Sequence, residues 1–118
     1  MIKKFDERVQ SERIEMKGGA GSALLREIVS KSEMYDKCRL FTTITLKENC
    51  GIGYHQHENE SEIFVVISGQ AIYNDNGNEQ VVKVGDVMVC ASGEGHSIRN
   101  EEKDDCSFVA LIVLDDNK

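Results

Sequence analysis

Apolar and polar residues alternate with a period of two along most of the chain, which is typical of half-buried β-strands. The alternation recurs in eight segments: 23–29, 38–46, 62–68, 70–74, 80–84, 86–90, 96–100 and 106–114. Clusters of Gly, Asn and Asp separate them, and Asn76-Gly77 predicts a tight hairpin turn because both residues tolerate positive φ. The pattern therefore predicts an all-β fold, and its spacing fits a jelly roll or a barrel-like sandwich.

The alternation fails before residue 20. We therefore expect residues 1–22 to form an N-terminal arm and residues 23–116 to form the domain. A short helix or an irregular segment is compatible with residues 7–16, and the glycine-rich residues 17–23 indicate a flexible lead into the first strand.

Two of the predicted strands are apolar on both faces. They contain the runs IFVVI (63–67) and FVALIVL (108–114), whereas an isolated two-layer sandwich exposes one face of each strand to water. We expect a second subunit to cover the outer face, which predicts a homodimer. The alternative is a partial cover by the chain's own N-terminal segment.

The composition limits the partners. A length of 118 residues supports one core, and 40% hydrophobic with 30% charged residues is ordinary for a globular domain. A net charge of −7 without a basic cluster disfavours nucleic acid. No apolar run approaches the roughly 20 residues of a membrane span, and the start lacks a signal-like stretch. We therefore expect a cytoplasmic protein without a membrane partner.

The four cysteines are scattered, with no CxxC spacing, at positions 38, 50, 90 and 106. In a reducing compartment this pattern favours free thiols.

All three histidines fall in two short segments. His55 and His57 would project from the same face of a strand, while Gln56 points away. If the next strand pairs with this one, Glu62 adds a carboxylate oxygen, and His96 opens a later strand. Imidazole and carboxylate donors suit a divalent metal and leave positions open for water or substrate. The alternative is two surface histidines and one buried, hydrogen-bonded histidine.

Both segments resemble the motifs of the cupin family. Residues 49–69 (NCGIGYHQHENESEIFVVISG) are similar to the first motif, with His55, His57, Glu62 and Gly69 in place. Residues 85–100 (GDVMVCASGEGHSIRN) are similar to the second motif, with matches at Gly85, Gly93, His96 and Asn100. The resemblance implies a cupin-type jelly roll, or double-stranded β-helix barrel, with a metal held by His55, His57, Glu62 and His96.

Two positions depart from the family pattern. Glu48-Asn49 replaces the usual Pro-Gly, and Asn is the next best residue to Gly at a left-handed turn. Ala91 replaces the proline of the second motif, which costs rigidity but no ligand atom.

The sequence indicates where a small polar ligand would bind and leaves its identity open. Tyr73 and Arg39 are candidates to contact a carboxylate or sugar-type ligand, although packing and solvation are the ordinary roles of such residues. The resemblance permits a metal-dependent isomerase, decarboxylase or dioxygenase, and equally a non-catalytic binding protein. The donor set suits Mn, Fe, Ni, Zn or Cu.

Overall fold

The computed structural model describes residues 1–115, and the predicted domain end at residue 116 lies outside them. Three 3-10 turns are present: η1 (Phe5–Glu7), η2 (Met16–Gly18) and η3 (Ser32–Met34). Ten strands follow the order β1 (Gln10–Ile14), β2 (Ser22–Glu27), β3 (Cys38–Leu46), β4 (Cys50–Gln56), β5 (Glu60–Ser68), β6 (Gln70–Asp75), β7 (Asn78–Lys83), β8 (Val87–Cys90), β9 (Gly95–Asn100) and β10 (Cys106–Leu114).

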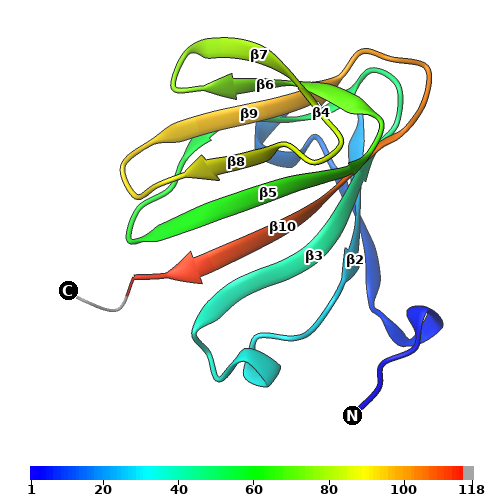
Figure 1. Cartoon of the computed structure of the whole chain (residues 1–118), viewed down its shortest axis with the longest axis vertical. Coiled ribbons are helices and arrows are strands. Elements are labelled where there is room, and N and C mark those ends of the chain that lie inside the picture. Colours follow the sequence, from blue (N-terminus) through cyan, green and yellow to red (C-terminus); the bar gives the residue numbers. More distant parts are fainter. Residues whose placement is uncertain (116–118) are drawn as a thin grey trace.

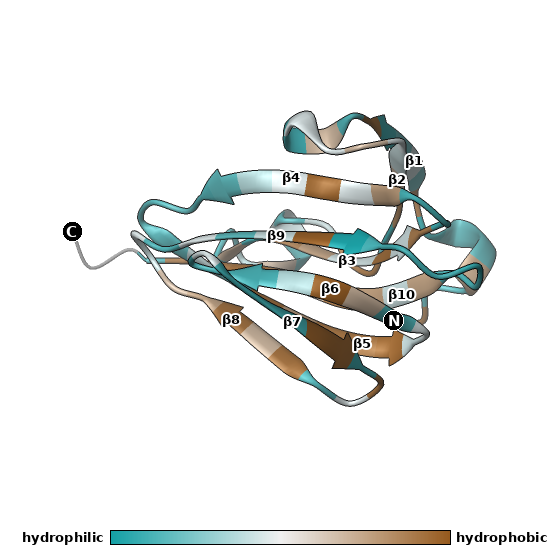
Figure 2. Cartoon of the chain, turned by 90° about the horizontal axis from the view of Figure 1, so that it is seen from above, coloured by the Kyte–Doolittle hydropathy of each residue, from teal (hydrophilic) through white to brown (hydrophobic). Residues whose placement is uncertain are grey.

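The strands form two antiparallel sheets that face each other (Figures 1 and 2). One sheet has the order β1-β2-β3-β10-β5-β8, and the other has the order β4-β9-β6-β7. Neighbours in these sheets come from distant parts of the chain, as in the pairing of β10 with both β3 and β5. The predicted all-β jelly roll is thus confirmed.

Two strands, β1 and β4, lie outside the eight alternating segments and have little apolar patterning; for β4 only the part around His55 was expected to be a strand. All five residues of β1 are exposed, and β1 pairs with β2 alone at the edge of the sheet. It occupies the region in which a helix or irregular segment was expected. β4 contains two glycines, Gly51 and Gly53, which break the alternation. A Cβ on Gly53 would overlap the Lys17 carbonyl oxygen, so this glycine permits close backbone approach by the arm.

The expected turns form where the sequence places them. Asn76 and Gly77 have φ values of 51° and 100° in the β6–β7 hairpin, and Asn49 has a φ of 61° before β4. Ala91, which stands where the family has proline, gives the turn a hydrogen bond that proline could not make: the Ala91 amide donates to Glu94 Oε1 at 2.9 Å.

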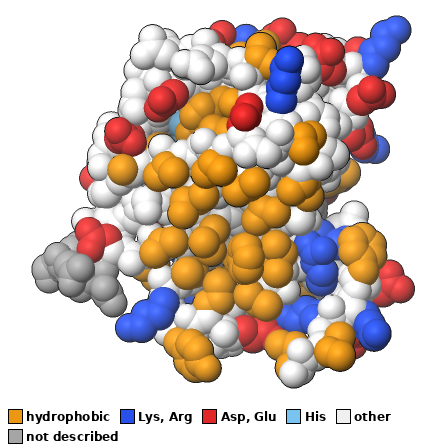
Figure 3. Space-filling model, in the orientation of Figure 1, with side chains coloured by type: hydrophobic (Ala, Val, Ile, Leu, Met, Phe, Trp, Pro, Cys, Tyr) orange, Lys and Arg blue, Asp and Glu red, His pale blue; other side chains and the backbone are white. Residues whose placement is uncertain are grey.

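The outer face of the larger sheet carries a continuous apolar patch, which we call the outer patch (Figure 3). Cross-strand registers align Val89, Ile63, Leu111 and Phe41 in one row across β8, β5, β10 and β3. The next row holds Val87, Val65 and Val109. Val87 and Val89 are 60% and 55% exposed, so no described segment covers that end of the sheet.

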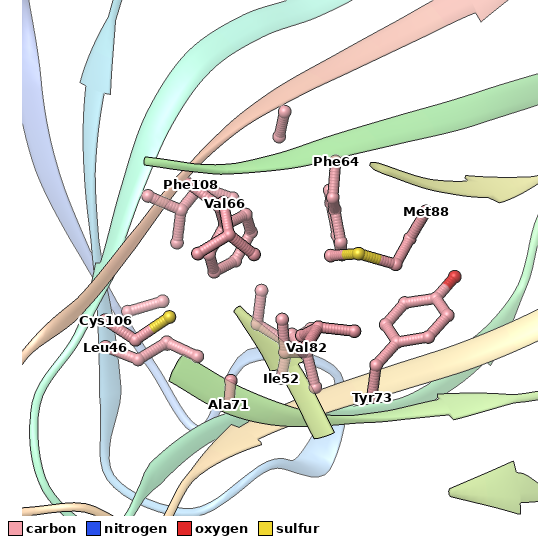
Figure 4. Close-up of a cluster of buried hydrophobic side chains, with 14 of the residues drawn as sticks. Leu46, Ile52, Phe64, Val66, Ala71, Tyr73, Val82, Met88, Cys106 and Phe108 are labelled. Carbon is pink, nitrogen blue, oxygen red and sulfur yellow. The ribbon is translucent and has the colours of Figure 1, made fainter. Parts of the chain in front are cut away.

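The core lies between the two sheets and combines inward residues from both (Figure 4). Phe64 and Phe108 pack with ring centroids 4.6 Å apart, and Tyr73 reaches Phe64 from the opposite sheet. The fully buried Asn100 donates through Nδ2 to the carbonyls of Leu46 and Asp104, each at 2.9 Å. This side chain ties the end of β9 to the end of β3 and to the following loop.

Candidate metal centre

A β-bulge in β4 aims the paired histidines into the barrel. Ile52 pairs with Ile98 and His55 pairs with His96, so β4 has one residue more than β9 between these pairs. Without the extra residue, Tyr54 would oppose His96 and His55 would face outward. Instead Tyr54 is exposed, and His57, just beyond the end of β4, is buried.

Four side chains from separate segments converge at one point. His55, His57, Glu62 and His96 each offer one donor atom, and these atoms lie within 4.8 Å of one another. Nε2 of His57 lies 3.0 Å from Glu62 Oε1 and 3.1 Å from His96 Nε2. His96 Nε2 also lies 3.1 Å from Glu62 Oε1, whereas His55 Nε2 is 4.0 Å away from it. All four predicted ligand residues are therefore brought together.

The second nitrogen of each ring fixes the direction of the first. His55 Nδ1 donates to the Gly53 carbonyl at 2.7 Å, and His57 Nδ1 donates to Glu60 Oε2 at 2.6 Å. These partners only accept hydrogen bonds, so Nδ1 carries the proton and Nε2 keeps its lone pair. His96 Nδ1 lies 2.8 Å from the Tyr73 hydroxyl. Partners of this kind orient the histidine ligands of metal sites.

Two of the closest metal-ligating atoms repel each other unless a cation lies between them. His57 Nε2 keeps its lone pair and lies 3.0 Å from the carboxylate oxygen Glu62 Oε1, and His96 Nε2 lies 3.1 Å from both. A metal ion or a proton satisfies them. Metal–ligand distances of about 2.1 Å put adjacent ligands about 3 Å apart, so the spacing fits a divalent metal.

The electrostatic environment acts differently on each ligand. Burial lowers the pKa of His55, which favours the neutral, metal-binding form. The hydrogen bond that the protonated His57 ring makes to Glu62 raises the pKa of His57 despite its burial. Burial disfavours the Glu62 carboxylate, but its interactions with the imidazoles of His57 and His96, strongest when those rings are protonated, outweigh this effect and lower its pKa. Glu62 is therefore ionised at neutral pH and supplies the negative charge of the site.

A cavity of about 230 Å³ opens onto the cluster. Four apolar residues line it: Met16, Leu25, Leu40 and Ile112. Three basic residues, Arg13, Lys17 and Arg39, line it as well. Cavities that hold drug-sized ligands have about 300–1,000 Å³, so this one suits a smaller, anionic ligand.

The two sequence candidates for ligand contact occupy different places. Arg39 lines the cavity, and it also forms a two-pronged ion pair with Glu60 at 2.8 and 2.7 Å. Tyr73 lies behind His96, buried in the core, where it holds that ring through its hydroxyl. Sequence reasoning did not place Arg13 and Lys17 at the site, and it did not predict that Glu60 orients His57. Only the position of Glu60, two residues before Glu62 and thus on the same strand face, signalled a relation to the site.

Comparison with known proteins identifies the class. The sequence profile described as "Cupin domain" matches residues 42–113, and the chain belongs to this family. An "Oxalate-binding protein" from Thermotoga maritima is 39% identical over 107 residues, which are 90% of this chain and 88% of that protein.

Solved structures agree on the fold. A Thermotoga maritima structure described as "a predicted oxalate decarboxylase" superimposes with a TM-score of 0.92 at 36% identity, over 97% of this chain and 99% of that chain. KdgF from Halomonas sp. has a TM-score of 0.73 at 15% identity, over 96% and 94%, and supports the fold alone. No helix within residues 1–115 has the length and apolar character needed to cross a membrane.

Proposed function

We propose that this cupin binds a divalent metal through His55, His57, Glu62 and His96 and uses it to hold a small carboxylate. The supporting observation is the cluster of converging lone pairs at the end of a small, cation-lined cavity. When bound, the metal supplies a Lewis-acidic centre with positions open to oxygen ligands. The protein's own residues orient the donors, exclude water on the apolar wall and neutralise the ligand's charge.

Oxalate is the first ligand to test, because a relative that is 39% identical is named for binding it. The cavity lining supports this choice of a small dicarboxylate, because it carries three basic residues and only one carboxylate, that of Glu62.

Binding without turnover is the function that we favour over catalysis. Decarboxylation of a dicarboxylate replaces a carbon–carbon bond with a carbon–hydrogen bond and therefore needs a proton donor beside the ligand. The candidate groups are engaged elsewhere: Glu60 with Arg39 and His57, Glu94 with the Ala91 amide, and Tyr73 with His96. The cavity lining described above includes no other carboxylic acid, tyrosine or thiol.

The experiment is a calorimetric titration of oxalate into metal-loaded protein and into protein stripped with a chelator, after elemental analysis of the metal. We expect binding only in the loaded form, with no formate or carbon dioxide released on prolonged incubation. Equal binding to both forms would refute the metal-dependent function. Release of formate would instead assign the protein to the decarboxylases.

We also infer that a second copy of the chain covers the outer patch, which makes the protein a homodimer. The rows through Ile63 and Val65 are uncharged across four strands, so two copies can meet there without burying charge. The N-terminal segment contacts this face where Arg8 donates to Thr43 Oγ1 at 2.9 Å, and Val87 and Val89 at the far end remain exposed. A cytoplasmic location accords with four free cysteines.

A further inference from the structure

The three basic residues around the cavity differ in how their charge is balanced. Arg39 is paired with Glu60, so this ion pair adds almost no net charge to the cavity. The side chains of Arg13 and Lys17 have no hydrogen-bond or ion-pair partner within residues 1–115. Two positive charges therefore face the cavity without compensation from the protein.

Both residues are exposed, and backbone pairing and backbone contacts hold them beside the cavity. Arg13 pairs with Ala23, whose side chain is fully buried, and opposite residues in an antiparallel pair share a face. Arg13 therefore lies on the barrel side of the edge strand β1.

Lys17 is held by a backbone contact between the arm and β4, and both segments carry glycines at this contact. Its φ is 54°, in the left-handed region, and its carbonyl oxygen occupies the space above Gly53. A Cβ on Gly19 would overlap the Gly51 carbonyl oxygen in the same way. The glycines that suggest a flexible lead in the sequence instead fasten the arm against β4.

The charge balance at the site then indicates the ligand class. A divalent metal with Glu62 and three neutral imidazoles leaves one positive charge, which a single carboxylate neutralises. Arg13 and Lys17 remain for a second anionic group. The whole chain carries −7, so a dianion is repelled at long range and needs local cations to bind.

We propose that Arg13 and Lys17 are specificity residues that bind the second carboxylate of a dianionic ligand whose first carboxylate is held at the metal. This assignment rests on the proposed function, and it adds that the N-terminal arm selects dicarboxylates over monocarboxylates. The alternative is that both side chains are ordinary solvated surface charges.

Oxalate and oxamate test this selection, because oxamate has the same size but carries an amide in place of one carboxylate. Both are titrated into metal-loaded wild type and into the Arg13→Gln/Lys17→Gln double variant. We expect the variant to bind oxalate on the order of 10- to 100-fold more weakly, and oxamate with less than about a threefold change. Its metal content should equal that of wild type.

Two controls separate charge from structure. Arg13→Lys/Lys17→Arg keeps both charges and should retain most of the oxalate affinity. Lys103→Gln removes an exposed lysine from the β9–β10 loop and should leave both affinities unchanged. The assignment is overturned if metal-loaded wild type binds oxalate and the double variant either binds oxalate equally well or loses affinity equally for oxalate and oxamate. That result would leave the proposed function standing. Failure of metal-loaded wild type to bind oxalate and oxamate would refute both.

Discussion

Replacing His57 with alanine should remove most of the stability that the protein gains from metal. His57 is buried, and its Nε2 lies within 3.1 Å of donor atoms from both Glu62 and His96. Metal at 1,000 times its dissociation constant stabilises the fold by about 4 kcal/mol if only the folded chain binds it. Unfolding entropies of about 2.1 cal/mol/K per residue give about 0.25 kcal/mol/K for this chain, so the wild-type gain is about 16 °C.

The variant keeps three ligands and should retain a small part of this gain. If the loss of one ligand weakens metal binding about 100-fold, the same metal concentration stabilises by only about 1.4 kcal/mol, or about 6 °C. The assay is thermal unfolding of each protein with saturating metal and with chelator, and the quantity compared is the difference between the two midpoints. This difference cancels the separate cost of removing a buried side chain.

Gln56→Ala is the matched control, because Gln56 is the neighbouring residue but points outward. Its side chain makes one exposed hydrogen bond, from Nε2 to the Gly93 carbonyl at 3.2 Å. The control should keep nearly the whole metal-dependent gain. If chelator lowers the midpoint of His57→Ala as much as that of wild type, or if Gln56→Ala loses as much as His57→Ala, the four-residue metal site is refuted.

Three further predictions concern the surroundings of the site and the assembly. The hydrogen bond from Arg39 is the main cause that lowers the pKa of Glu60 to about 2 from its usual value near 4.5. The stability from this carboxylate is present above about pH 4.5 and is lost as the pH falls toward 2. The urea midpoints at pH 5 and pH 3 should therefore differ less for Glu60→Gln than for wild type. An equal difference in the two proteins would contradict this. Asn100→Ala leaves the buried Leu46 carbonyl without its donor and should cost about 2–4 kcal/mol in a denaturant titration, whereas a loss below about 1 kcal/mol would show that the side chain is dispensable. Val89→Lys places a charge in the outer patch and should convert a dimer to a monomer in light scattering at micromolar concentration; a monomeric wild type, or a variant that stays dimeric, would refute the second-subunit cover.

Alternating hydrophobicity predicted most strands because each needs only one buried face. The predicted bounds of β3 and β10 match the structure to the residue, since inward positions such as Ile44 and Phe108 are apolar. β1 has no buried face and β4 contains two glycines, so neither carried this signal. Edge pairing and close backbone approach depend on neighbours that local patterning does not show.

Strand alternation and motif spacing are local properties, so they were enough to predict the fold class and, through the cupin resemblance, the four residues of the candidate metal centre. How these residues meet depends on the three-dimensional fold. The bulge after Ile52 turns His55 inward, and Glu60 and Tyr73 come from two different sheets to orient His57 and His96. The fold also placed Lys17 at the cavity through glycine contacts with β4, about 35 residues further along the chain, and Arg13 through the pairing of β1 with β2. Contacts between such distant segments depend on sheet order and register, which no single stretch of sequence encodes.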